Sequence, residues 1–142
     1  ASHAVNDFRK LCGIEAYATT DNVDELTARA NDEGWEHIFT DWLTASKINE
    51  DHDAVFVLSV GGGAGNVSIP IQEVASLCFV KSIRLFGIVG RDHNATANQA
   101  EVCIIIPTVE PSRVTPHTEG WQSVILHAIV SHPDLQRNKT KW

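Results

Sequence analysis

The stretch that most constrains the fold is 55–66, VFVLSVGGGAGN. Five of its first six residues are apolar, which is the pattern of a strand buried on both faces, and we expect it to be the central strand of a parallel sheet. Four glycines follow, and Asn66 stands where a helix would begin. This outline is typical of a phosphate site, because glycines let the backbone approach an anion and the N–H groups at a helix start point at it. The spacing matches neither GxGxxG nor the loop ending in Gly-Lys-Ser/Thr, so a plain tight turn stays the alternative.

Strands and helices alternate along the chain. Apolar runs predict strands over 14–19, 55–60, 83–89 and 102–106. Helical spacing predicts helices over 2–11, 23–30, 35–48, 66–80, 95–100 and 117–131. The fold class is therefore α/β, a parallel sheet with helices on both faces. Ligands of such sheets bind beyond the carboxyl ends of the strands.

Composition excludes several classes of protein. A formal charge of −7 argues against nucleic acid or an anionic membrane as partner, and no run approaches the roughly 20 apolar residues of a membrane span. We expect a cytoplasmic protein with one domain over 1–142. Its three cysteines lack metal or redox spacing, so they are expected as buried reduced thiols. The chain opens on a helix without a preceding strand and contains no Met, which predicts that an N-terminal part is absent.

Two pairs of polar residues could meet in one site. His3 and Asp7 lie four residues apart on one predicted helix, and Glu119 and His127 lie eight apart on another, offset by about 80°. Two histidines and two carboxylates are a donor set for zinc or a related divalent ion. The alternative is an ordinary surface ion pair at i, i+4 spacing.

Five segments, in order, resemble the sugar isomerase (SIS) domain: SHAVNDF, ANDEGWEHIF, VFVLSVGGGAGNV, LFGIVGRD and TEGWQSVILHAIV. Within it they are most similar to the phosphoheptose isomerase family, which interconverts sedoheptulose 7-phosphate and a heptose 7-phosphate. The resemblance implies a flavodoxin-like three-layer sandwich whose first strand and N-terminal helices are missing from this chain. It also implies a sugar-phosphate aldose–ketose isomerase, a homotetramer, and one divalent metal ion, zinc.

The resemblance also assigns roles to the polar pairs. His3, Asp7, Glu119 and His127 correspond to the family's metal-binding residues, and Asp7, His127 and Glu119 to its catalytic acid and base groups. Asp7 stands for a Glu and Glu119 for a Gln. The first exchange shortens a base by one methylene, and the second adds a negative charge that favours a cation.

The glycine loop departs from the family pattern Ser-Thr-Ser-Gly-Asn-Ser. Ser59 matches the first serine, but Val60, Gly61 and Ala64 replace three hydroxyl residues. Each lost charge-assisted hydrogen bond is worth about 1.5–3 kcal/mol. Substrate and phosphate binding is predicted for Ser59, Gly61, Gly62, Gly63, Ala64, Asn66 and Asp21, although Asp21 or Asn22 could instead cap a helix.

Two other functions remain open. One is a non-catalytic SIS module that binds a sugar phosphate or a protein partner, favoured by the lost loop hydroxyls. The other is a nucleotide-binding doubly wound domain, which Gly90 weakens because it stands where an acidic residue would hold a ribose. The leading prediction is the isomerase, since a pure binding module has no need of the polar pairs.

Overall fold

The structure is a computed structural model that describes residues 1–140. Three parallel strands, β1 (Ala54–Ser59), β2 (Arg84–Val89) and β3 (Val102–Ile105), form a sheet of order β1-β2-β3. In register, Ser59 lies opposite Val89. The prediction that the strand before the glycine loop is central is wrong for the described sheet, because β2 holds that place and β1 lies at an edge.

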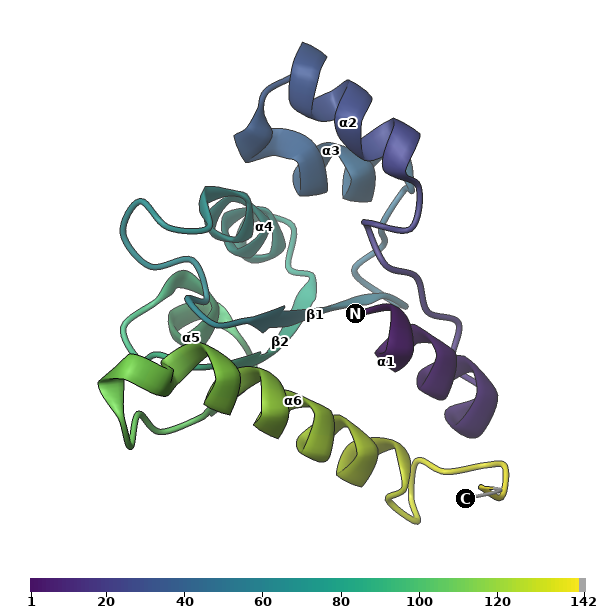
Figure 1. Cartoon of the computed structure of the whole chain (residues 1–142). Coiled ribbons are helices and arrows are strands. Elements are labelled where there is room, and N and C mark those ends of the chain that lie inside the picture. The colour runs from purple at the N-terminus through teal and green to yellow at the C-terminus, as the bar shows by residue number, and fades with distance from the viewer. Residues whose placement is uncertain (141–142) are drawn as a thin grey trace.

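Helices cover both faces of the sheet, as predicted. The helical elements are α1 (Ser2–Asp7), the π-helical η1 (Phe8–Cys12), α2 (Val23–Asp32), the 3-10 turn η2 (Trp35–His37), α3 (Ile38–Ala45), α4 (Ile69–Val80), α5 (Ala95–Gln99), the 3-10 turn η3 (Pro111–Arg113) and α6 (Val114–Val130). Figure 1 shows α4 and α5 on one face and α6 with α1 on the other, and α2 with α3 beyond α4.

The apolar core is divided by the sheet. On one face, Val57 and Leu85 belong to a buried cluster with Val74 of α4. On the other face, Ile88 is fully buried in a cluster with Ala4 of α1 and Leu126 of α6. Because α1 and α6 share this second cluster, apolar burial holds their polar residues against the same side of the sheet.

The strand predicted over 14–19 is absent. Ile14 and Tyr17 are exposed there, and the segment pairs with no strand within residues 1–140. Arg9 holds it against the first helices instead: its Nη1 donates to the Ala16 carbonyl at 3.1 Å, and its guanidinium lies 5.4 Å from the centre of the Tyr17 ring. Alternating residues alone do not make a strand, because the backbone needs a neighbouring strand to pair with.

Two of the helix ends lie where the sequence predicts them, and the predicted cap at Asn66 is wrong. Gly13 adopts a left-handed conformation after η1, and the Asn22 side chain caps α2 by accepting from the Glu25 N–H at 3.3 Å. Asn66 caps no helix, because α4 begins only at Ile69. Pro70 explains the later start: proline lacks an N–H and is tolerated only in the first turn of a helix.

The cysteines are free thiols, and two of the three are buried as predicted. Cys12 and Cys78 are buried and Cys103 is half-buried, and none is in a disulfide. Burial raises the pKa of the Cys78 thiol to about 11, so it stays protonated at neutral pH.

No helix within residues 1–140 combines the length and the apolar character that a membrane crossing requires.

Candidate functional site

Three of the four residues predicted to bind metal meet in one cluster, His3, Asp7 and His127. The two histidine Nε2 atoms are 3.1 Å apart. The Asp7 Oδ2 lies 3.2 Å from Nε2 of His3 and 3.6 Å from Nε2 of His127. One acidic oxygen and two imidazole nitrogens therefore converge on a single point, from residues 124 positions apart in the chain.

Local structure explains this convergence. His3 and Asp7 are one helical turn apart on α1, and the intervening Ala4 is packed into the core. On α6, the buried Leu126 and Val130 fix the turn that carries His127. The site is thus placed by apolar residues adjacent to its polar ones.

The start of α6 is fixed on the carboxyl end of β2. A Cβ at Gly90, the residue after β2, would lie 2.0 Å from the Thr118 Oγ1, so only glycine lets the helix approach this closely. One turn further, Gln122 Nε2 donates to the Ile88 carbonyl at 2.8 Å and to the Ser59 carbonyl at 3.4 Å. The sequence analysis missed Gln122, although it stands in the closing segment TEGWQSVILHAIV that carries the resemblance.

Asp7 is the buried member of the cluster. Its side chain is only 5% exposed, whereas those of His3 and His127 are 68% and 45% exposed. Asn6 Nδ2 donates to the second carboxylate oxygen of Asp7 at 3.0 Å. Burial, with the negative charge of Asp7 as a smaller cause, raises the pKa of the Cys12 thiol. A buried carboxylate needs a positive partner, and the two imidazoles or a cation between them can supply it.

The spacing of the three ligand atoms fits a tetrahedral metal ion. Ligand atoms bound about 2.0–2.2 Å from a tetrahedral centre lie roughly 3.3–3.6 Å from one another. Of the observed separations, 3.6 Å lies at the upper end of that range, and 3.1 and 3.2 Å lie within about 0.2 Å of its lower end. Two imidazoles and a carboxylate would leave a fourth position open, which is the arrangement of catalytic zinc sites.

Glu119 lies outside this cluster. It is exposed near the start of α6, and eight helical residues place it about 12 Å along the axis from His127. The group of potential metal ligands that lie within 4.8 Å of one another contains only His3, Asp7 and His127 among the described residues. A role for Glu119 in the site stays a prediction.

The glycine loop is held by its own backbone and by α5. The Ser59 Oγ accepts from the Gly62 N–H at 3.0 Å, so the serine hydroxyl that matches the family pattern has a structural partner. The carbonyl of Gly62 accepts from the N–H and the hydroxyl of Thr96, and that of Gly63 from the Ala95 N–H. Gly61, Gly62 and Gly63 are buried.

The outer part of the loop opens onto a hollow of about 330 Å³, which Gly61, Ala64, Gly65, Val67 and Arg91 line. Asn66 is exposed nearby in the chain but does not line it. Arg91 was missed in the sequence, where it is part of the polar loop GRDHN after β2. Its place at the carboxyl end of a parallel strand was the signal that could have found it.

Asp21 ties two segments together at the surface. Its carboxylate accepts from the Ser2 hydroxyl at 3.1 Å and from the Ala18 N–H at 3.3 Å. The helix-cap alternative for Asp21 is wrong, because Asn22 caps α2. The contact with Ser2 ties Asp21 to the first turn of α1. The other histidines are outside the cluster: His37, His52, His93 and His132 are exposed and His117 is half-buried.

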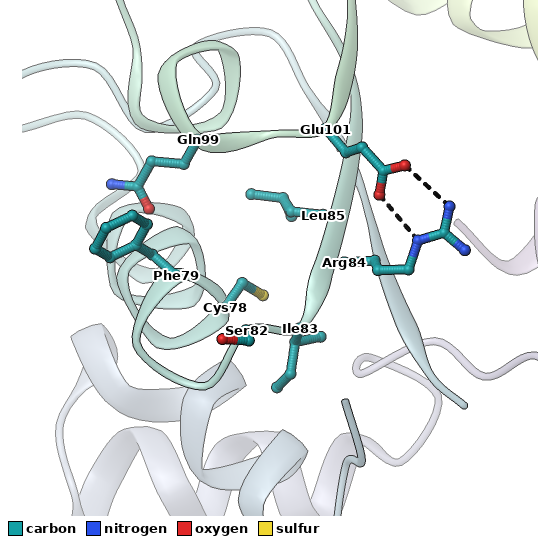
Figure 2. Close-up of a pocket in the computed structure, with 8 residues that line it drawn as sticks. All are labelled: Cys78, Phe79, Ser82, Ile83, Arg84, Leu85, Gln99 and Glu101. Carbon is teal, nitrogen blue, oxygen red and sulfur yellow. Dashed lines mark hydrogen bonds and ion pairs between the residues drawn. The ribbon is translucent and has the colours of Figure 1, made fainter. Parts of the chain in front are cut away.

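A second hollow, of about 360 Å³, contains none of the predicted site residues. It lies around the start of β2, and its lining is Cys78, Phe79, Ser82, Ile83, Arg84, Leu85, Gln99 and Glu101. Figure 2 shows its two charged residues, Arg84 and Glu101, paired with each other, through hydrogen bonds of 2.9 and 3.0 Å. The two charges of this hollow are therefore paired with each other.

Comparisons with known proteins agree with the sequence resemblance. No protein-family model matches the chain. The phosphoheptose isomerase of Aneurinibacillus thermoaerophilus is 30% identical over 118 residues, which cover 82% of this chain and 54% of that protein. The phosphoheptose isomerase of Geobacter sulfurreducens is 27% identical over 117 residues, which cover 82% of this chain and 57% of that protein. The chain is a relative of the phosphoheptose isomerases. It spans about half the length of these relatives.

Solved structures show the same fold. A phosphoheptose isomerase from Neisseria gonorrhoeae superposes with a TM-score of 0.72 at 21% identity, over 92% of this chain and 67% of that one. One from Francisella tularensis gives a TM-score of 0.70 at 19% identity, over 91% and 65%. The parallel α/β fold is therefore the SIS fold of the phosphoheptose isomerases, as the resemblance predicted.

Proposed function

We propose that the protein is a sugar-phosphate aldose–ketose isomerase, with sedoheptulose 7-phosphate as the first substrate to test. The observation that carries the proposal is the meeting of His3, Asp7 and His127 at one point, in a fold shared with phosphoheptose isomerases. An isomerase of this kind must remove a proton from the carbon next to a carbonyl and return one to the adjacent carbon. Imidazole and carboxylate groups are suited to both steps.

His127 and Asp7 are the proposed acid and base. His127 is 45% exposed, which lets a substrate reach its imidazole, whereas Asp7 is almost fully buried. In the metal-free site, the 3.6 Å separation of their facing atoms lets the carboxylate stabilise the imidazolium that forms when His127 takes the proton; with an ion bound, the same Nε2 would be a ligand instead. The substrate passes through an enediol, and the proton returns to the neighbouring carbon.

His3, Asp7 and His127 would hold the divalent ion, and zinc fits their donor atoms best. Zinc, when bound, supplies a Lewis acid that polarises the substrate oxygens. Asn6 would orient the carboxylate for this role through its hydrogen bond to the second oxygen. Glu119 is proposed as a further group that polarises the substrate or completes the site.

A non-catalytic module that binds a sugar phosphate is the second candidate. The observation in its favour is the engagement of Ser59, whose hydroxyl accepts from the Gly62 N–H and sits in a loop without the other family hydroxyls. A homotetramer and a cytoplasmic location remain predictions of the resemblance.

The experiment is an isomerase assay with sedoheptulose 7-phosphate on the full-length protein, with zinc analysis of the same preparation. We expect turnover in the wild type and a loss of about 100-fold or more in His127→Ala, because a general acid–base group contributes about 10²–10⁴. His132→Ala is the matched control, since this histidine is exposed and outside the cluster. Absence of turnover from zinc-loaded, folded wild type would refute the enzyme and leave the binding module.

A further inference from the structure

The segment that follows α6 turns back onto the first helices of the chain. Helix α6 ends at Val130, and residues 137 and 138 contact the end of η1. Figure 1 shows this yellow segment beside the purple start of the chain. Residues 133–138, called the strap below, therefore connect the two helical segments that carry the polar cluster.

The strap binds the carbonyl groups at the end of η1. The last carbonyls of a helix have no partner within the helix itself. The Leu11 carbonyl accepts from the N–H groups of Arg137 at 2.8 Å and Asn138 at 2.9 Å. The Lys10 carbonyl accepts from the Asn138 Nδ2 at 2.8 Å. Asn138 thus contributes both its backbone and its side chain to the end of η1.

Leu135 is the apolar contact of the strap. It is half-buried and packs against a cluster of three buried residues, Leu11, Cys12 and Val130. Within this cluster the Cys12 thiol donates to the Val130 carbonyl at 3.7 Å. The cluster joins η1 to the end of α6, and Leu135 adds apolar burial to that junction.

This junction lies about one helical turn from the polar cluster on both helices. Leu11 follows Asp7 by four residues, and Val130 follows His127 by three. The separation of Asp7 from His127 depends on how the first helices sit on α6, because the two residues come from different helices. Contacts that fix the two helices at this end therefore act on that separation.

The segment directly after η1 does not anchor the first helices to the sheet. Residues 14–19 pair with no strand within residues 1–140, and Ile14 is exposed. The apolar contacts of α1 and η1 with the sheet side of the core come from Ala4 and Phe8, before the last turn. The end of η1 is thus held largely by residues from the other end of the chain.

We propose that the strap positions the first helices on α6, with Leu135 and Asn138 as positioning residues for the His3, Asp7 and His127 cluster. The inference rests on the proposed function for the role of that cluster. A metal site keeps its affinity only when its ligands are held close to the geometry that the ion requires. The strap supplies this support from outside the cluster, through helix ends and not through the ligands.

The test compares Leu135→Ala with the wild type in the full-length protein. Hydrogen exchange read by mass spectrometry should be about 10-fold faster in residues 2–12, because local opening of these helices becomes easier. Zinc affinity, measured by competition with a chelator, should fall about 3- to 10-fold, less than the roughly 10- to 100-fold typical of residues that hydrogen-bond a ligand. Leu135→Met keeps the side-chain volume and should restore both values.

Two further variants separate positioning from general destabilisation. Asn138→Asp removes the donor to the Lys10 carbonyl and should change both values in the same direction, by a smaller factor. Leu77→Ala is the matched control, because Leu77 is also half-buried but packs on the opposite face of the sheet. It should leave zinc affinity unchanged and should not selectively speed exchange in residues 2–12.

Unchanged exchange in residues 2–12 of Leu135→Ala would overturn the inference. Faster exchange with unchanged zinc affinity, or a wild type that binds no zinc, would also overturn it. None of these measurements uses turnover, so they are separable from the isomerase assay. Zinc binding that depends on Leu135 but comes without turnover would support the strap and refute the isomerase. Turnover with zinc binding that is independent of Leu135 would do the reverse.

Discussion

The contact between Gly90 and α6 predicts a large penalty for the smallest possible substitution, Gly90→Ala. The added methyl would lie 2.0 Å from the Thr118 Oγ1 and 3.0 Å from its Cβ and Cγ2. Rotating Thr118 cannot relieve all three contacts, because its Cβ does not move. Helix α6 would have to shift, against the two carbonyls that Gln122 holds.

The expected change in the free energy of unfolding for Gly90→Ala is the difference between two opposing effects. Overpacking of a buried contact costs about 1–3 kcal/mol. Gly90 does not have a positive φ, so alanine adopts its backbone freely and recovers about 0.4–1 kcal/mol through the unfolded chain. We expect Gly90→Ala to lower the free energy of unfolding by about 1–2 kcal/mol.

Gly120→Ala is the matched control, on the same helix. A Cβ at Gly120 meets nothing within 4 Å, and the position is inside α6. Alanine is favoured over glycine in a helix interior by about 0.8–1 kcal/mol, so this variant should be more stable than the wild type. Two glycine-to-alanine changes are therefore predicted to have opposite signs.

The assay is urea unfolding followed by far-UV circular dichroism, with linear extrapolation to water. The double variant Gly90→Ala/Thr118→Ala should recover about 1 kcal/mol relative to the sum of the single changes, since the Oγ1 contact is gone. Equal midpoints for the Gly90→Ala and Gly120→Ala variants would show that α6 does not lie on the end of β2.

Three further predictions concern the cluster, a thiol and a helix cap. Asp7→Asn should weaken zinc binding about 10-fold or more, measured by competition with a chelator, because the anionic ligand becomes neutral. Stability should fall by about 2 kcal/mol between pH 9 and pH 11, since the Cys78 thiol ionises near pH 9 unfolded and near 11 folded, and Cys78→Ala should flatten this slope in urea titrations. Asn22→Ala should cost about 1 kcal/mol in the same assay by removing the cap on α2.

The parts of the fold that the sequence predicts well are those set by local pattern and burial. Strands β1, β2 and β3 are continuous apolar runs, and each lies within one residue of its predicted bounds. The segment 14–19 mixes apolar and polar residues and is not a strand, because pairing depends on a partner that local pattern does not contain. Pro70 indicates where α4 begins, because proline is favoured in the first turn of a helix. The prediction that Asn66 caps this helix did not take Pro70 into account.

Site residues on helices could be predicted from helical periodicity or from family motifs. Site residues on loops could not. The i, i+4 spacing predicted that His3 and Asp7 share a face, and the resemblance brought in His127. The exposed position of Glu119 depends on where α6 lies along the sheet, which the spacing of eight residues does not determine. Arg91 faces the glycine loop only because two loops meet at one sheet edge.

The meeting of residue 3 with residue 127 has a consequence for synthesis of the chain on the ribosome. A bacterial or eukaryotic ribosome adds about 5–20 residues per second, so His3 is made about 6–25 s before His127. The three strands lie within residues 54–105, between the two. Helix α6 covers one apolar face of the sheet and also carries His127, so that face is buried and the cluster is completed by the same late-made segment.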